Sequence, residues 1–159
     1  MDLYGFKIDV FFLIHNGEIL AYAWHYDEER ALKHMKKIME FHNLKGEIKR
    51  SKELEEWLRK KINEIVLEGK KFKLPNFSYH NKSVYENVIE IPKGKTATYT
   101  QIAKVSGVKF TELLITLMRN PFQILIPCHR LLTKKGTLMG FYPLGREVKR
   151  KILEIEGER

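Results

Sequence analysis

Cys128 and His129 are adjacent in the sequence, and their types best fit nucleophilic chemistry. The thiolate is the nucleophilic form of cysteine, and histidine is the side chain that accepts a proton near neutral pH. An apolar run, Phe122–Ile126, precedes them between Pro121 and Pro127. Because the run is short and rich in large and β-branched residues, it predicts a buried strand that Pro127 ends. A thiol at that point would lie on rigid support and face a pocket.

The alternative is a purely structural role, in which Cys128 is an inert, buried, small hydrophobic residue, as a lone cysteine usually is. With one cysteine the chain cannot form an internal disulfide, and it opens on neither a signal segment nor a long apolar span. We therefore expect an intracellular, cytoplasmic protein that does not associate with membranes.

Composition also bears on cofactors. Four histidines of the N-terminal half have no cysteine or clustered carboxylate at metal-ligand spacing, so we expect no metal site and treat them as packing or surface residues. The chain contains no Walker motif or dinucleotide-binding fingerprint, so we expect no cofactor. These histidines are His15, His25, His34 and His42.

The net charge of +9 favours a polyanionic partner, although solubility alone could explain such a charge. Its distribution is uneven, because residues 79–159 carry 14 Lys and Arg against 7 Asp and Glu, while residues 1–78 carry 15 against 13. The basic excess lies in the half that contains Cys128.

The N-terminal half predicts a β-hairpin followed by two helices. Residues 6–15 and 18–25 are apolar and aromatic and flank Asn16-Gly17, which suits a tight turn. Asp27 can cap a helix that runs to about His42, and a second helix should follow Ser51 and end near Gly69. Residues 70–82 mix lysine with apolar residues and predict a linker between two units.

The C-terminal half predicts mostly helices. Residues 83–91 have apolar residues at helical spacing, and Thr98 with Gln101 has the spacing of a capping box that starts a short helix ending at Gly107. Residues 109–119 carry one apolar stripe and predict a second helix. Two short helices around a glycine make a helix-turn-helix candidate, although on this pattern alone DNA binding is less probable than plain architecture.

The remaining segments complete the expected fold. Residues 140–145 predict a loop, and residues 146–156 predict a closing helix. The expected fold is α/β (α+β), with an N-terminal domain of sheet and helices at 1–78. A mostly helical, winged-helix-like domain with the helix-turn-helix would follow at 79–159.

Pro127-Cys128-His129-Arg130 after Ile124-Leu125-Ile126, with Asn120-Pro121 upstream, resembles the active-site signature of the O6-alkylguanine-DNA alkyltransferases, or methylated-DNA-protein-cysteine methyltransferases. The resemblance extends over most of the C-terminal half. Tyr99 resembles the family's tyrosine at the start of the helix-turn-helix, Tyr142 that of the active-site loop, and Glu156-Gly157 the closing acidic residue and glycine. The N-terminal half matches only in order and size.

The resemblance implies stoichiometric DNA repair. Cys128 would attack the alkyl carbon on O6 of guanine, and possibly on O4 of thymine, and be spent because a thioether is not readily hydrolysed. His129 would deprotonate the thiol through a water while Glu156 holds the imidazole. Tyr99 would donate a proton to N3 of the departing base. Asn120 would support the turn that carries the cysteine.

The resemblance further implies that a monomer binds double-stranded DNA in the minor groove through residues 109–119 and flips the target base out of the stack. The backbone at Cys128 and Leu131 would recognise the exocyclic amine. The expected DNA-contacting or substrate-contacting residues are Tyr99, Lys109, Met118, Arg119, Arg130, Leu131 and Tyr142.

The chain departs from the family pattern at several places. Glu112 stands where the family usually has the arginine that fills the space of the flipped base, and Lys109 or Arg119 are the candidates to replace it. Pro143 and Leu144 stand where small residues are usual, so a serine hydroxyl that would contact O6 is absent.

Two other functions fit parts of this pattern. An alkyltransferase-like protein that only flags lesions would normally lack the cysteine, and a cysteine hydrolase would turn over repeatedly.

Overall fold

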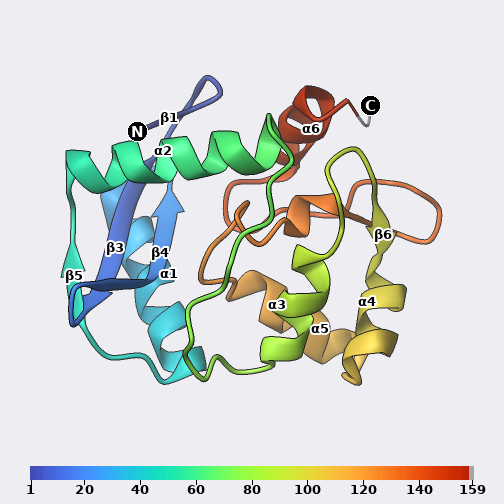
Figure 1. Cartoon of the computed structure of the whole chain (residues 1–159), viewed down its shortest axis with the longest axis horizontal. Coiled ribbons are helices and arrows are strands. Elements are labelled where there is room, and N and C mark those ends of the chain that lie inside the picture. The colour runs from blue at the N-terminus through green and yellow to red at the C-terminus, as the bar shows by residue number, and fades with distance from the viewer. Residues whose placement is uncertain (158–159) are drawn as a thin grey trace.

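In the computed structural model, which describes residues 1–157, the N-terminal half is built around a three-stranded antiparallel sheet ordered β4–β3–β5 (Figure 1). The predicted hairpin is confirmed, and its turn residues Asn16 and Gly17 both have positive φ, at 51° and 75°. The sequence did not predict β5 or the short β1–β2 pair. The strands are β1 (Asp2–Leu3), β2 (Phe6–Lys7), β3 (Asp9–His15), β4 (Glu18–His25) and β5 (Glu47–Lys49).

Two helices belong to this half, and both begin where their capping residues predict. Asp27 accepts a hydrogen bond from the Arg30 backbone N–H at the start of α1 (Glu28–His42), and Ser51 accepts one from Leu54 at the start of α2 (Lys52–Val66). Each cap satisfies an N–H that has no partner inside the helix. Helix α1 packs against β3 and β4.

The C-terminal half is mostly helical, as predicted. The capping box forms in full, because the Thr98 hydroxyl accepts from Gln101 N while the Gln101 amide accepts from Thr98 N. Gly107, at φ 70°, ends that helix and turns the chain into the next one. The elements are α3 (Lys82–Ile89), β6 (Ala97–Thr98), α4 (Tyr99–Ser106), α5 (Phe110–Met118), the 3-10 helix η1 (Cys128–Arg130), β7 (Leu131–Leu132) and α6 (Arg146–Ile155). Strands β6 and β7 pair in parallel.

The segment 120–132 runs through the centre of the molecule, and every residue in it is buried. The prediction of a strand at Phe122–Ile126 is wrong. The backbone folds into turns there, with Ile124 at φ 79° and the Ile126 N–H donating to the Phe122 carbonyl over 2.8 Å. An apolar run signals burial but not extension, and this run has no neighbouring strand along its length. Its polar backbone groups are instead satisfied by turn bonds and by β4, where Tyr22 N donates to Pro121 O over 2.9 Å.

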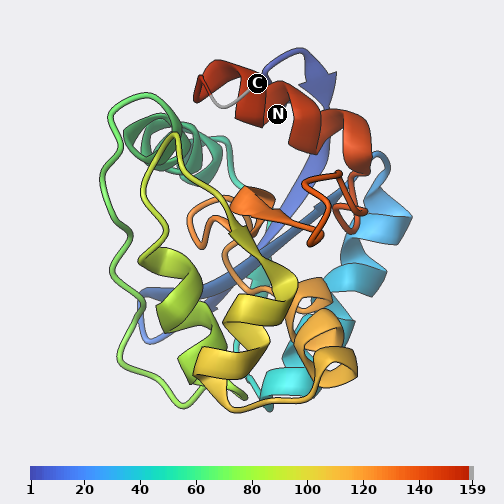
Figure 2. The same cartoon turned by 90° about the vertical axis from the view of Figure 1, so that its right-hand side faces the viewer.

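One hydrophobic cluster contains buried residues of both halves. The predicted linker contributes to it, because Tyr79 is buried and its hydroxyl donates to the Leu20 carbonyl over 2.7 Å. Turning the molecule by 90° shows η1 and β6 lying between α6 and the α4–α5 pair (Figure 2). The division at residue 78 remains a prediction. Within residues 1–157, no helix has the length and apolar character that crossing a bilayer requires.

Candidate active site

The thiol of Cys128 is held where the central segment leaves its turns and enters η1. Asn120 fixes this point, because its side-chain Nδ2 donates to the Ile126 carbonyl over 3.1 Å and lies 3.4 Å from the Cys128 sulfur. Its Oδ1 accepts from the Phe122 N–H over 2.9 Å. Asn120 therefore lies where the supporting role expected of it requires.

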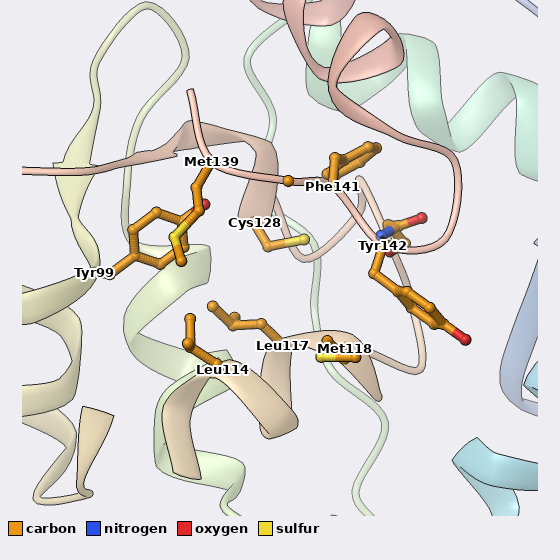
Figure 3. A pocket seen from close by; sticks show the side chains of 10 residues that line it. Tyr99, Leu114, Leu117, Met118, Cys128, Met139, Phe141 and Tyr142 are labelled. Carbon is orange, nitrogen blue, oxygen red and sulfur yellow. Dashed lines mark hydrogen bonds between the residues drawn. The ribbon is translucent and has the colours of Figure 1, made fainter. Parts of the chain in front are cut away.

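The sulfur points into a cavity of about 190 Å³ (Figure 3). Helix α5 forms one wall, Tyr99 of α4 stands beside it, and residues 139–142 of the active-site loop form the opposite wall. The lining is mainly apolar, so a flat heterocycle could fill it while its polar edge met the few polar groups present. The lining residues are Tyr99, Leu114, Leu117, Met118, Gln123, Cys128, Met139, Gly140, Phe141 and Tyr142.

Burial raises the pKa of the Cys128 thiol above its ordinary value of 9.0, while the hydrogen bond from Asn120 and the positive charge of Lys149 partly offset the rise. The group is a neutral thiol at neutral pH and needs a base before it can attack.

His129 is fully buried, and its Nε2 lies 3.1 Å from Oε2 of Glu156. Burial lowers the pKa of His129 and outweighs the opposing effect of Glu156, so the imidazole is neutral near pH 7. Burial acts to raise the pKa of Glu156, but the hydrogen bonds and charges of His129 and Arg130 prevail and hold it below its usual 4.5. Within residues 1–157 no protein group hydrogen-bonds to Nδ1 of His129. The pair is thus a neutral base beside an ionised carboxylate.

Tyr99 lines the cavity, and its hydroxyl oxygen accepts a hydrogen bond from Nζ of Lys149 over 2.7 Å. Burial raises the pKa of Tyr99, so the phenol keeps its proton. Because the Lys149 ammonium only donates, the Tyr99 O–H proton must point elsewhere, and it is available to a group in the cavity.

The residues expected to contact DNA or substrate separate into two groups. Lys109 and Met118 are exposed at the two ends of α5, Arg119 is half-buried as its C-cap, and Tyr142 is exposed with its ring 5.1 Å from the His34 ring. These four lie at or near the surface.

The other three, Tyr99, Arg130 and Leu131, are buried. Arg130 is 3% exposed and donates to both carboxylate oxygens of Glu156 and to the Ile91 and Ile65 carbonyls. This geometry contradicts a DNA contact through the guanidinium, which instead ties η1 to α6, to the end of α2 and to the residues after α3. The Leu131 side chain is also fully buried, so only its backbone is a candidate for recognition.

Two site residues were missed from the sequence. Lys149 is a fully buried lysine on α6, and Gln123 lies on the cavity wall inside a run that was judged only by its apolar character. A signal was present for Gln123, because it is the one polar residue of Phe122–Ile126. No sequence signal marked Lys149, because other lysines lie nearby in the chain and its residue type does not distinguish it from them. Among residues 1–157, no three His, Cys, Asp or Glu side chains gather as metal ligands.

Comparison with known proteins points to one family. The model of the family described as "6-O-methylguanine DNA methyltransferase, DNA binding domain" matches residues 80–158. A methylated-DNA-protein-cysteine methyltransferase of Saccharolobus islandicus is 41% identical over 75 residues, 47% of this chain and 48% of that protein. The match thus spans about half the length of such curated relatives.

Solved structures extend the likeness to the overall fold. The O6-methylguanine-DNA methyltransferase of Pyrococcus kodakaraensis aligns over 91% of this chain and 89% of its own, with a TM-score of 0.66 at 23% identity. A Mycobacterium tuberculosis OGT crystallised in complex with DNA aligns over 62% of this chain and 63% of its own, with a TM-score of 0.53 at 27% identity. The first likeness covers both halves, including the N-terminal sheet that sequence comparison leaves unmatched.

Proposed function

Because the chain belongs, through residues 80–158, to the 6-O-methylguanine DNA methyltransferase family, we propose that it repairs DNA by moving the alkyl group of O6-alkylguanine onto Cys128. The observation that carries the proposal is the placement of the chain's only thiol on the wall of an apolar cavity, beside a buried His129–Glu156 pair and against α5. The arrangement supports a nucleophile with its own base.

In the transfer step, the Cys128 sulfur forms a bond to the alkyl carbon while the bond between that carbon and O6 breaks. The electron pair stays on the guanine, which leaves. One thiol and one O6-alkylguanine thus give one thioether and one guanine, and the protein acts once.

The thiol proton needs an acceptor, because burial keeps the sulfur neutral. We assign this role to His129, through a water that joins its Nδ1 to the sulfur, and Glu156 holds the other ring nitrogen. The depressed pKa of His129 suits this role, because the imidazole is already free to accept a proton at pH 7. The imidazolium then returns its proton to solvent, and the departing guanine anion takes up one proton, so that neutral guanine leaves.

The departing guanine gains negative charge, and Tyr99 is placed to neutralise it. Its O–H proton is available to the cavity that Tyr99 lines, because Lys149 approaches the phenol oxygen as a donor. Donation to N3 of the base would stabilise charge that develops only as the bond breaks, which makes it a contribution to the rate and not to substrate binding.

The recessed sulfur requires the base to leave the duplex stack, since O6 of a stacked guanine cannot enter the cavity. We propose that a monomer presents α5 to the minor groove of double-stranded DNA, with Lys109 and Arg119 on phosphates and Met118 and Tyr142 at the cavity mouth. Glu112 does not replace the family's arginine, because its carboxylate accepts from the Asn81 amide over 3.0 Å and carries the wrong charge. The exposed apolar side chains near the mouth, Ile115 and Met118, give α5 an apolar face there.

A thiol that must stay reduced to react fits a cytoplasmic protein. We therefore place the activity in the cytoplasm.

Mass analysis after incubation with duplex DNA that contains O6-methylguanine tests the function. We expect one permanent methyl on Cys128, no transfer by Cys128→Ala, and DNA affinity of that variant close to wild type. An unmodified protein would favour the lesion-flagging alternative. Continued product without an adduct would indicate a hydrolase.

A further inference from the structure

Gln123 is a buried side chain, 5% exposed, that joins three parts of the molecule. It lines the cavity next to Cys128. Its Oε1 accepts a hydrogen bond from Nε1 of Trp24 on β4 over 2.5 Å, and its Nε2 donates to the backbone carbonyl of Tyr142 in the active-site loop. Gln123 is thus a polar link from the N-terminal sheet to the cavity.

The partners of this amide leave only one orientation for it. An indole N–H can only donate and a backbone carbonyl can only accept, so the oxygen must face Trp24 and the NH₂ must face the loop. An NH₂ group has two protons, and Tyr142 takes one. The second is available to a group in the cavity that Gln123 lines together with Cys128, and Gln123 acts to lower the pKa of Cys128 against the effect of burial.

We propose that Gln123 is a positioning residue of the alkyl-transfer site, whose amide Trp24 locks so that one N–H holds the Tyr142 carbonyl and the other donates to the Cys128 sulfur. This deepens the proposed function and rests on it. It also assigns a task to the N-terminal sheet, which fixes the orientation of a group beside the nucleophile although it supplies no atom to the reaction.

The competing explanation is that Gln123 only ties the loop to the rest of the protein. A second tether of the same loop provides the matched control, because the Tyr26 hydroxyl donates to the Leu144 carbonyl over 2.5 Å and Tyr26 does not line the cavity. Removing that hydroxyl loosens the loop without changing the groups that face the sulfur.

The test uses Gln123→Glu, Trp24→Phe and Tyr26→Phe in the full chain. Glutamate keeps the acceptor for Trp24 but replaces both N–H donors with a carboxylate oxygen. Trp24→Phe removes the indole N–H together with part of the buried ring, and frees the amide to turn. The first readout is the pH dependence of Cys128 alkylation by iodoacetamide without DNA, which is unambiguous because the chain has one cysteine. The second is single-turnover methyl transfer.

We expect Gln123→Glu to move the midpoint of alkylation up by roughly one pH unit, because a like charge beside a thiolate disfavours it. Trp24→Phe should move it in the same direction by less, and Tyr26→Phe should leave it unchanged. If the glutamate variant does not fold, Gln123→Leu, which keeps the volume and loses both donors, should also raise the midpoint.

Equal midpoints in wild type and in the folded Gln123 variants would overturn the proposal, as would an equal shift in Tyr26→Phe. A failure of the proposed repair function can be distinguished from a failure of the role proposed for Gln123. Wild-type protein that alkylates normally but takes no methyl from DNA would refute the function, and the iodoacetamide series would still decide the role of Gln123.

Discussion

Replacing Arg130 with methionine should lower the free energy of unfolding at pH 7 by about 3–5 kcal/mol, because it strands a buried carboxylate. The guanidinium lies 2.5 Å from Oε2 of Glu156 through Nη2 and 3.1 Å from Oε1 through Nε. It also donates to the Ile91 carbonyl over 2.7 Å and to the Ile65 carbonyl over 3.2 Å. Methionine fills the space but donates nothing, so the two carbonyls that lose their donor place the loss toward the upper end of that range.

The loss should depend on pH in a defined direction. The folded pKa of Glu156 lies below its ordinary 4.5, so the stability that its charge contributes is present above that value and is lost as pH falls through the folded pKa. Protonation removes the stranded charge. The difference between Arg130→Met and wild type should therefore shrink as pH approaches 4.

Urea unfolding at pH 7 and at a pH well below 4.5 measures both effects. Arg150→Met is the matched control, because Arg150 donates to Glu147 over 2.7 Å from a position where both side chains are largely exposed. It should change the unfolding free energy by less than about 0.5 kcal/mol. A loss under about 1 kcal/mol for Arg130→Met, together with weaker DNA binding, would refute the internal role and restore the DNA contact.

Three further predictions concern the reaction and its substrate. The rate of single-turnover methyl transfer should not change with pH near neutrality, and should fall about tenfold per pH unit once His129 becomes protonated. This fall should begin below pH 6.5, the ordinary pKa of histidine, because burial lowers the pKa of His129. A rate that stays constant into clearly acidic buffer would exclude His129 as the base. Tyr99→Phe should slow transfer about 10²-fold while the DNA dissociation constant measured by fluorescence anisotropy stays close to wild type, and a large loss of affinity would contradict its role. Lys109→Ala should weaken binding to lesion-containing and intact duplexes alike and reduce the slope of log affinity against log salt by about 0.9, and an unchanged slope would show that Lys109 meets no phosphate.

The elements that the sequence predicted well are those specified by hydrogen bonds between residues close together in the chain. The side chains of Thr98 and Gln101 accept hydrogen bonds from each other's backbone N–H groups, three residues apart. Asp27 and Ser51 each accept one from a backbone N–H in the first turn of α1 or α2. Such signals need no knowledge of the rest of the chain. The helix-turn-helix followed from them and from the apolar stripe of α5.

The central segment could not be predicted in this way because its conformation depends on distant partners. Phe122–Ile126 has the composition of a strand, yet its backbone is held by Asn120 and by Tyr22, whose hydroxyl donates to the Gln123 carbonyl. The same reason hid Lys149, whose partner Tyr99 is 50 residues away. The resemblance placed Arg130 among the expected DNA-contacting or substrate-contacting residues, whereas the acceptors of its guanidinium come from three distant parts of the chain.

The burial of Cys128 has two opposing consequences for the proposed single reaction. Desolvation keeps the sulfur neutral and so protects it from passing electrophiles, because a thiol is a far weaker nucleophile than a thiolate. The groups that favour the thiolate, Asn120, Gln123 and Lys149, are already in place, as is His129, the proposed base. What is lacking before substrate enters is the alkyl carbon itself, held against the sulfur in the right direction. Selectivity then rests on which bases can enter the cavity, and the thiol need not be strongly activated beforehand.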